Sequence, residues 1–174
     1  MPCTQLSWQE LDRAIPTDSY DMLICRGNSL PYAMSWSVDK LCDAEQAKVA
    51  INQALAQFQK ILRPGGVLLV DKSAFESSGF YVIDKQGVVE GQDCHIHWVF
   101  VNDLVAGIRR WDQYNTVDSQ TTCLTLYSLL ITEEMLLEWL IEAGFVSICQ
   151  TPLKRENIYT VYTAHKPVGA TTFA

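Results

Sequence analysis

Hydrophobic positions along this chain follow two periods, one typical of helices and one typical of strands. Residues 20–25 (YDMLIC) and 67–70 (VLLV) are short apolar runs between polar turns, which favours strands buried on both faces. Residues 43–62 between them carry apolar side chains at helical spacing, and residues 63–66 (RPGG) end that helix. The order strand, helix, strand predicts a βαβ unit with parallel strands and a right-handed crossover.

The C-terminal part predicts a second helix and two further strands. Residues 132–143 are helical in pattern, with Thr132 as the N-terminal cap and Gly144 as the C-terminal cap. The apolar stripe of this helix consists of Leu136, Leu137, Leu140 and Ile141. Residues 145–149 and 159–164 follow as strands, and residues 167–174 as a loose tail. We therefore expect a single α/β domain over residues 1–174.

Residues 76–130 show a different pattern, which predicts an antiparallel insertion in this domain. We interpret residues 84–87 (DKQG) as the turn of a hairpin. Strict alternation over residues 94–101 places His95 and His97 on one face of a strand. Two such imidazoles can bind a metal, but the sequence offers no evident third ligand. We predict a polar sheet face here and no metal site.

Composition and charge exclude several kinds of partner. The chain has 174 residues, 48% of them hydrophobic, and a formal net charge of −7. This charge argues against a nucleic acid or an anionic membrane as the main partner, because both attract concentrated positive charge. No apolar run approaches the length of a membrane helix, and residues 1–20 show no signal-peptide pattern. Six scattered cysteines without a Cys-x-x-Cys pair indicate reduced thiols and a cytoplasmic location.

Two strand ends are the candidate places for chemistry, because open α/β sheets bind ligands at the carboxyl ends of their parallel strands. The first is residues 26–29 (RGNS), where glycine permits close approach of the backbone to a ligand. The second is residues 71–75 (DKSAF). The alternative interpretation of each segment is an ordinary polar turn between a strand and a loop.

Four segments in this order resemble a known family. They are residues 6–12 (LSWQELD), 20–30 (YDMLICRGNSL), 62–71 (LRPGGVLLVD) and 136–145 (LLEWLIEAGF). Together they resemble the C-terminal half of a class I S-adenosylmethionine-dependent methyltransferase, nearest to the glycine/sarcosine N-methyltransferase type. The resemblance implies a partial Rossmann-like methyltransferase sheet that contains only the later strands, with S-adenosylmethionine as the cofactor and a small molecule as the methyl acceptor.

The resemblance also implies a role for each matching residue in cofactor binding. Ser7 and Trp8 would lie at the adenine, with the indole packed on the base. Arg26 and Gly27 would meet the methionine part of the cofactor through backbone groups, and Asn28 would lie beside them.

On the acceptor side, the resemblance places Asn28 and Ser29 near the point of methyl transfer, where they would hold the substrate. Apart from the resemblance, the position of Tyr32 and Trp36 after this turn favours a part of a lid over the site. Catalysis in this family is mainly alignment of nucleophile, methyl carbon and sulfur, so no catalytic acid–base residue is expected.

Two departures from the family pattern change what we expect of this chain. The glycine-rich turn after the first family strand and the acid that ends the second would precede residue 6, and Gly-x-Gly-x-Gly occurs nowhere in the sequence. Relative to the family, we therefore expect about three strands with their helices to be missing, and we expect the chain to bind cofactor poorly or not at all. Ser73 also replaces the arginine with which glycine-type enzymes bind an amino-acid carboxylate. Glycine and sarcosine are therefore not expected as substrates.

Two other hypotheses remain open. The chain can be a non-catalytic half-domain that acts as an interaction module, or as a homodimer through an exposed sheet edge. It can also be a fragment of a longer gene product.

Overall fold

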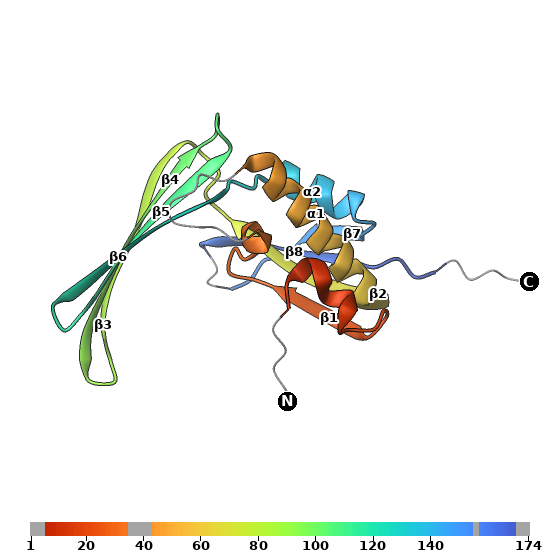
Figure 1. Cartoon of the computed structure of the whole chain (residues 1–174), viewed down its shortest axis with the longest axis horizontal. Coiled ribbons are helices and arrows are strands. Elements are labelled where there is room, and N and C mark those ends of the chain that lie inside the picture. Colours follow the sequence, from red (N-terminus) through yellow and green to blue (C-terminus); the bar gives the residue numbers. More distant parts are fainter. Residues whose placement is uncertain (1–5, 35–42, 155–156, 170–174) are drawn as a thin grey trace, which may run out of the picture. The chain divides into compact units, whose positions relative to one another are not determined.

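The computed structural model describes residues 6–34, 43–154 and 157–169 (Figure 1). These residues divide into two compact units. The mixed unit consists of the described residues of 1–34, 45–75 and 131–174. The antiparallel unit consists of residues 76–130 with residues 43–44. The predicted insertion over residues 76–130 thus corresponds to a separate unit.

The mixed unit is built on a four-stranded sheet, which confirms the predicted βαβ unit and the C-terminal strand pair. The strand order is β1 (Tyr20–Cys25), β2 (Leu62–Ser73), β8 (Tyr159–His165) and β7 (Val146–Gln150). The pair β1–β2 is parallel, and β8 runs antiparallel to both of its neighbours. Two short 3-10 helices, η1 (Trp8–Arg13) and η2 (Leu30–Ala33), flank β1 in the sequence.

Two helices pack on the same face of this sheet, as Figure 1 shows. They are α1 (Ala44–Ile61) and α2 (Glu133–Glu142). The buried stripe of α1 agrees with the prediction and consists of Ala47, Ile51, Ala54, Leu55, Phe58 and Ile61. In α2 the prediction was wrong in part, because Trp139 is buried with Leu136 and Leu140, whereas Ile141 is 64% exposed. Positions 136, 139 and 140 share one helix face, and position 141 lies outside it.

Both predicted caps of the C-terminal helix are present. The hydroxyl of Thr132 accepts a hydrogen bond from the backbone N–H of Met135 at 3.3 Å. Gly144 has a φ of +87°, and its N–H donates to the carbonyl of Ile141. The left-handed conformation at Gly144 ends the helix and directs the chain into β7.

An irregular start of β2 replaces the simple turn that we predicted for residues 63–66. The strand begins at Leu62, directly after α1, and the register changes between the pairs Tyr20–Leu62 and Met22–Val67. A Cβ on Gly66 would lie 2.8 Å from the carbonyl oxygen of Arg63. Glycine is therefore required at this position, because the backbone approaches itself too closely for a side chain.

The prediction that β1 is buried on both faces was wrong. Tyr20, Met22 and Ile24 are 47%, 56% and 61% exposed. Cys25 on the opposite face is 5% exposed. Within the described part of the chain, β1 pairs only with β2, so it is an edge strand. An apolar run shows that a strand can be covered on both faces, but not that the covering elements are present.

The antiparallel unit is a four-stranded meander of long hairpins (Figure 1). Its strands are β3 (Gly79–Val89), β4 (Gln92–Asp103), β5 (Ile108–Val117) and β6 (Gln120–Leu129). The prediction of a turn at residues 84–87 was wrong, because these residues lie within β3 and the turn is at Glu90 and Gly91. Both turn residues have positive φ, +52° and +83°, as two-residue hairpin turns of type I′ require.

Side chains alternate between two different faces of the antiparallel unit. One face is aromatic: the rings of Phe100 and Trp111 stack at 5.2 Å, and those of Trp98 and Trp111 meet edge to face at 5.0 Å. Arg109, 4% exposed, donates to the side-chain oxygen of Asn102 at 2.8 Å. The opposite face carries His95 and His97, as predicted from the alternation over residues 94–101. It is polar around these two residues, whereas Val99 and Val101 continue the same face as apolar side chains.

Some sequence-based predictions concern residues outside the described ranges. Cys3, Cys42, Trp36 and residues 170–174 of the predicted tail lie there, whereas residues 167–169 have no regular structure. Four described cysteines are free thiols: Cys25, Cys94, Cys123 and Cys149. Within the described residues, no helix combines the length and the apolar character needed to cross a membrane.

Candidate functional site

A buried carboxylate organises the loop that follows β1. Asp71 lies near the end of β2 and is 1% exposed. Its Oδ2 accepts from the backbone N–H of Gly27 at 2.9 Å and from Nε of Arg26 at 3.0 Å, and its Oδ1 accepts from the N–H of Asn28 at 2.7 Å. Because Cys25 pairs with Val70 in the parallel register, the residues that follow both strands meet at the same sheet edge. The two predicted strand ends therefore form one structure.

The backbone conformation of this loop suits the carboxylate. Gly27 and Asn28 have φ values of +82° and +55°, so both lie in the left-handed region. Consecutive N–H groups that point to one side in this way form a concave nest for an anion. The Asp71 carboxylate occupies this nest. A non-glycine residue in the left-handed region is uncommon, and asparagine is among the types that adopt it most readily.

Further hydrogen bonds fix the rest of the loop. The side-chain oxygen of Asn28 accepts from the N–H of Ser73 at 3.2 Å. The hydroxyl of Ser29 donates to the carbonyl of Arg26, and the carbonyl of Ser29 accepts from the N–H of Tyr32 at 2.9 Å. The structure thus brings four predicted site residues, 26–29, into one hydrogen-bonded loop, with Tyr32 half-buried in the short helix that follows.

The N–H groups of Gly27 and Asn28 already donate to Asp71. A ligand at this loop would therefore meet other backbone groups of residues 26–29, or the side chains of Asn28 and Ser29. The binding roles of these residues remain predictions. The organising role of Asp71 was missed from the sequence. One signal was present: Asp71 directly follows the apolar run of residues 67–70, and in a parallel pair of strands it lies beside the loop that follows residues 20–25.

An apolar pocket of about 330 Å³ lies beside β1. Its lining comes from η1, β1 and α1: Trp8, Leu11, Ile15, Tyr20, Met22, Leu23, Ile24, Cys25, Phe58 and Ile61. The indole of Trp8 packs against the ring of Phe58 with 5.4 Å between centroids. Trp8 and Cys25 line the same pocket, and Cys25 is directly followed by the loop at Arg26. A flat hydrophobic group fits this chemistry.

Ser7 does not take part in this pocket. It is exposed, and its hydroxyl donates to the carboxylate of Glu10 at 2.9 Å. The Cys25 thiol, in contrast, is buried against the sheet, and this burial, with the nearby Asp71 carboxylate, raises the pKa of Cys25 to about 12. A thiol with so high a pKa is a poor nucleophile, so Cys25 acts in packing rather than in chemistry.

The sequence matches no protein family and no curated protein to a significant degree. Solved structures do match. One is CalS10, an amino pentose methyltransferase from Micromonospora echinaspora, with a TM-score of 0.68, 15% identity and 91% of this chain covered. Another is DesVI from Streptomyces venezuelae, with a TM-score of 0.69, 14% identity and 92% covered. A third is the sugar N-methyltransferase KedS8 from Streptoalloteichus, with a TM-score of 0.64, 15% identity and 94% of this chain covered.

The matched region is only part of each of these proteins. This chain covers 62%, 63% and 61% of their respective lengths. At such low sequence identity the likeness concerns the fold. The chain therefore has a Rossmann-like fold, as in the methyltransferases CalS10 and KedS8, and corresponds to a part of it.

Proposed function

We propose that this chain is part of an S-adenosylmethionine-dependent methyltransferase that acts on a small molecule. The observation that carries the proposal is the loop of residues 26–29, which Asp71 holds at the carboxyl ends of two parallel strands. Ligands of open α/β sheets bind at such ends. The fold shared with the methyltransferases CalS10 and KedS8 and the sequence resemblance of these same residues support the assignment.

The described residues fit one part of the cofactor. The apolar pocket with Trp8 suits the flat adenine ring, because an indole can stack on a base. Residues 26–29 adjoin this pocket through Cys25 and would face the methionine part. When bound, the cofactor would supply the methyl group. This chain would help to align the methyl group of the cofactor with the acceptor, because Asp71 fixes the conformation of the loop of residues 26–29 in the absence of ligand.

The remaining part of the cofactor lacks matching residues here. The sequence contains no Gly-x-Gly-x-Gly turn to approach the methionine end. We propose that residues outside these 174 complete the pocket. The exposed apolar side chains of Met22 and Ile24, on an edge strand, support a missing neighbour at this position.

The proposed acceptor is a small molecule that is not held through an amino-acid carboxylate. Ser73 stands where the glycine/sarcosine type has arginine, and it is 4% exposed. Its N–H donates to Asn28 and its hydroxyl accepts from the N–H of Phe75 at 3.3 Å. Ser73 therefore stabilises the loop of residues 26–29 through its hydrogen bond to Asn28. We also propose a cytoplasmic location, which the four free thiols support.

Calorimetric titration with S-adenosylhomocysteine tests the proposal. The isolated chain should bind weakly, with a millimolar dissociation constant, and Trp8→Ala should weaken binding further. Trp98→Phe, which changes a tryptophan of the antiparallel unit, is the matched control and should leave binding unchanged. Micromolar binding by the wild-type chain would contradict an incomplete pocket. Equal binding by Trp8→Ala and the wild type would contradict the proposal that Trp8 binds the adenine.

A second candidate function is a homodimeric interaction module. The specific observation in its favour is the unpaired edge of β1, whose open face carries Tyr20, Met22 and Ile24. Such an edge can pair with the same edge of a second copy. Light scattering should then give a dimer mass, and Ile24→Lys should give a monomer. A monomeric wild-type chain would refute this alternative.

A further inference from the structure

The face of the antiparallel unit opposite its aromatic face carries a cluster of three side chains to which the proposed methyl transfer assigns no role. His95 and His97 are two residues apart in β4 and point to the same face. Asp84 of β3 lies directly opposite His97 in the antiparallel register. The Asp84 carboxylate contacts both imidazoles: Oδ1 lies 3.1 Å from Nε2 of His95, and Oδ2 lies 2.7 Å from Nδ1 of His97.

These three side chains offer one ligand atom each, and the atoms all lie within 4.8 Å of one another. Zinc binds imidazole nitrogen and carboxylate oxygen at about 2.0–2.2 Å, so two ligand atoms of one tetrahedral ion lie about 3.4 Å apart. Side-chain rotations would have to bring the three ligand atoms to this spacing. The side chains are 52%, 37% and 40% exposed for Asp84, His95 and His97, which leaves room for such rotations.

We propose that Asp84, His95 and His97 form a binding site for a divalent transition metal of the zinc type, with the remaining coordination position open to water. Two imidazoles and one carboxylate suit zinc better than magnesium or calcium, which prefer oxygen ligands. Three protein ligands and one open position are also the pattern of zinc sites that react or bind a further ligand, whereas structural sites use four protein ligands.

The electrostatics of the cluster agree with this geometry. The third side chain of the cluster is a carboxylate, whose negative charge would attract a cation. The contacts with Asp84 already place both imidazoles at one carboxylate, and zinc would replace these two contacts. On metal binding, each imidazole coordinates through the nitrogen that faces Asp84. A neutral imidazole then carries its proton on the other ring nitrogen.

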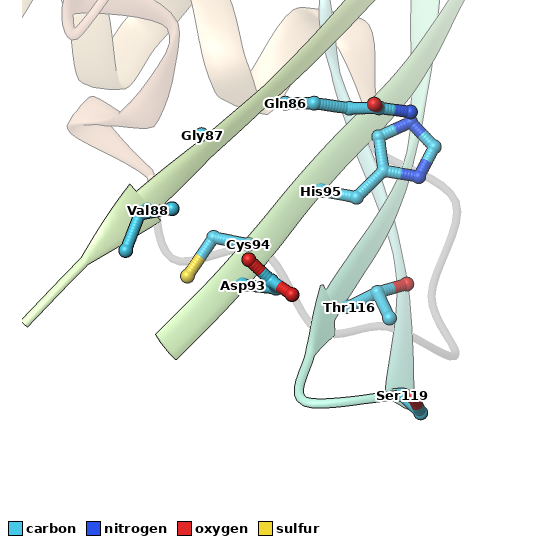
Figure 2. Close-up of a pocket in the computed structure, with 8 residues that line it drawn as sticks. All are labelled: Gln86, Gly87, Val88, Asp93, Cys94, His95, Thr116 and Ser119. Atoms are coloured by element: carbon cyan, nitrogen blue, oxygen red, sulfur yellow. The ribbon is translucent and has the colours of Figure 1, made fainter. Parts of the chain in front are cut away.

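An open pocket of about 580 Å³ adjoins the cluster, with His95 in its lining (Figure 2). Gln86 and Thr116 also line the pocket and are the cross-strand partners of His95 on β3 and β5. Figure 2 shows the Gln86 side chain beside the His95 ring. Tyr114 on β5 is the cross-strand partner of His97, and the centroids of their rings lie 5.9 Å apart. The pocket leaves space for water, or for a small ligand, beside His95.

A purely structural role is the competing explanation, since the same contacts can simply join β3 to β4. Both explanations predict some loss of stability when Asp84 is changed. Only the metal site predicts that the folded chain takes up zinc with these three residues. Metal binding itself is therefore the measurement that separates them, and it does not depend on methyltransferase activity.

The test is calorimetric titration of zinc chloride into the full chain after removal of metal with a chelator. We expect one zinc per chain with a micromolar dissociation constant. Asp84→Asn and His97→Gln should each weaken binding by at least about 100-fold, because even partners outside the ligand set affect metal affinity about 10- to 100-fold. His165→Gln, on β8 of the mixed unit, is the matched control and should bind zinc as the wild type does.

Cobalt(II) in place of zinc identifies the donor atoms. A nitrogen and oxygen set should give visible d–d bands without a thiolate charge-transfer band, although Cys94 lines the adjoining pocket. Absence of zinc binding by the wild type, unchanged affinity in Asp84→Asn, or a thiolate band would each overturn the proposal. Circular dichroism of every variant checks its fold, and Asp84→Asn, which keeps the size of the side chain, provides the test if His97→Gln does not fold.

Discussion

Replacing Asp71 by asparagine removes the charge around which the loop of residues 26–29 is built. The carboxylate accepts from Gly27 and Arg26 on one oxygen and from Asn28 on the other. An amide has one acceptor oxygen, so its NH₂ group must face at least one of these donors. Whichever orientation the amide takes, a backbone N–H that is now satisfied loses its partner.

The expected cost follows from the contacts that are lost. A hydrogen bond to a charged group contributes about 1.5–3 kcal/mol, and an unsatisfied buried donor costs about 1–3 kcal/mol. The ion pair with Arg26 adds less than a fully buried pair would, because the Arg26 side chain is 29% exposed and solvent screens it. We therefore expect Asp71→Asn to lower the free energy of unfolding by about 2–4 kcal/mol.

Urea unfolding followed by tryptophan fluorescence measures this effect. With a slope of about 1–3 kcal/mol per molar urea, the midpoint should fall by about 0.7 M or more. Asp21→Asn is the matched control: Asp21 pairs with Arg63 at 2.9 Å but is 83% exposed, so its loss should cost less than about 0.5 kcal/mol. A loss for Asp71→Asn as small as that of the control would refute the role of Asp71 as the anchor of the loop.

Three other predictions concern two positions in the same unit, Cys25 and Gly66. Iodoacetamide should label Cys25 far more slowly than the exposed Cys123 at mildly alkaline pH, as mass spectrometry can measure, because the pKa of Cys25 is raised to about 12; equal rates would contradict its burial. Since this pKa lies above the ordinary value of 9.0, the stability due to the neutral thiol is complete below pH 9.0 and is lost as pH rises through about 12. Gly66→Ala should destabilise the chain by about 1–3 kcal/mol in thermal unfolding, because a Cβ would collide with backbone carbonyl oxygen, whereas Gly87→Ala, with open space around it, should cost less; equal effects would show that the bulge in β2 adapts.

The elements whose signals are local could be predicted from the sequence. The stripe of α1, the cap at Thr132 and the glycine at position 144 each depend on residues within a few positions of one another. The parallel pairing of β1 with β2 also followed, because a helix of this length between two apolar runs leaves few other arrangements.

Features that depend on distant residues could not be predicted in this way. The exposure of β1 depends on which elements cover its open face, and the apolar sequence YDMLIC is the same in either case. The hydrogen bonds between Asp71 and the loop of residues 26–29 depend on the register between two strands about 45 residues apart. A strand end could be identified from the sequence, but the contacts across it could not.

The cluster of Asp84, His95 and His97 was not predicted, because the hairpin turn before His95 was placed at the wrong residues. We predicted the hairpin turn at residues 84–87, and a turn there would not place Asp84 in a strand beside His95 and His97. The observed turn at Glu90 and Gly91 sets Asp84 opposite His97. The pairing of the two long strands decides where the turn lies.

The most direct test of the account is a two-dimensional amide NMR titration of the chain with S-adenosylhomocysteine. Binding should be weak and saturate in the millimolar range, with the shift changes concentrated at residues 26–29 and at Trp8. The amides of β3 to β6 should remain unchanged. Shift changes confined to the antiparallel unit, or no change at residues 26–29 at saturating ligand, would contradict the central claim that this loop forms part of a methyltransferase cofactor pocket.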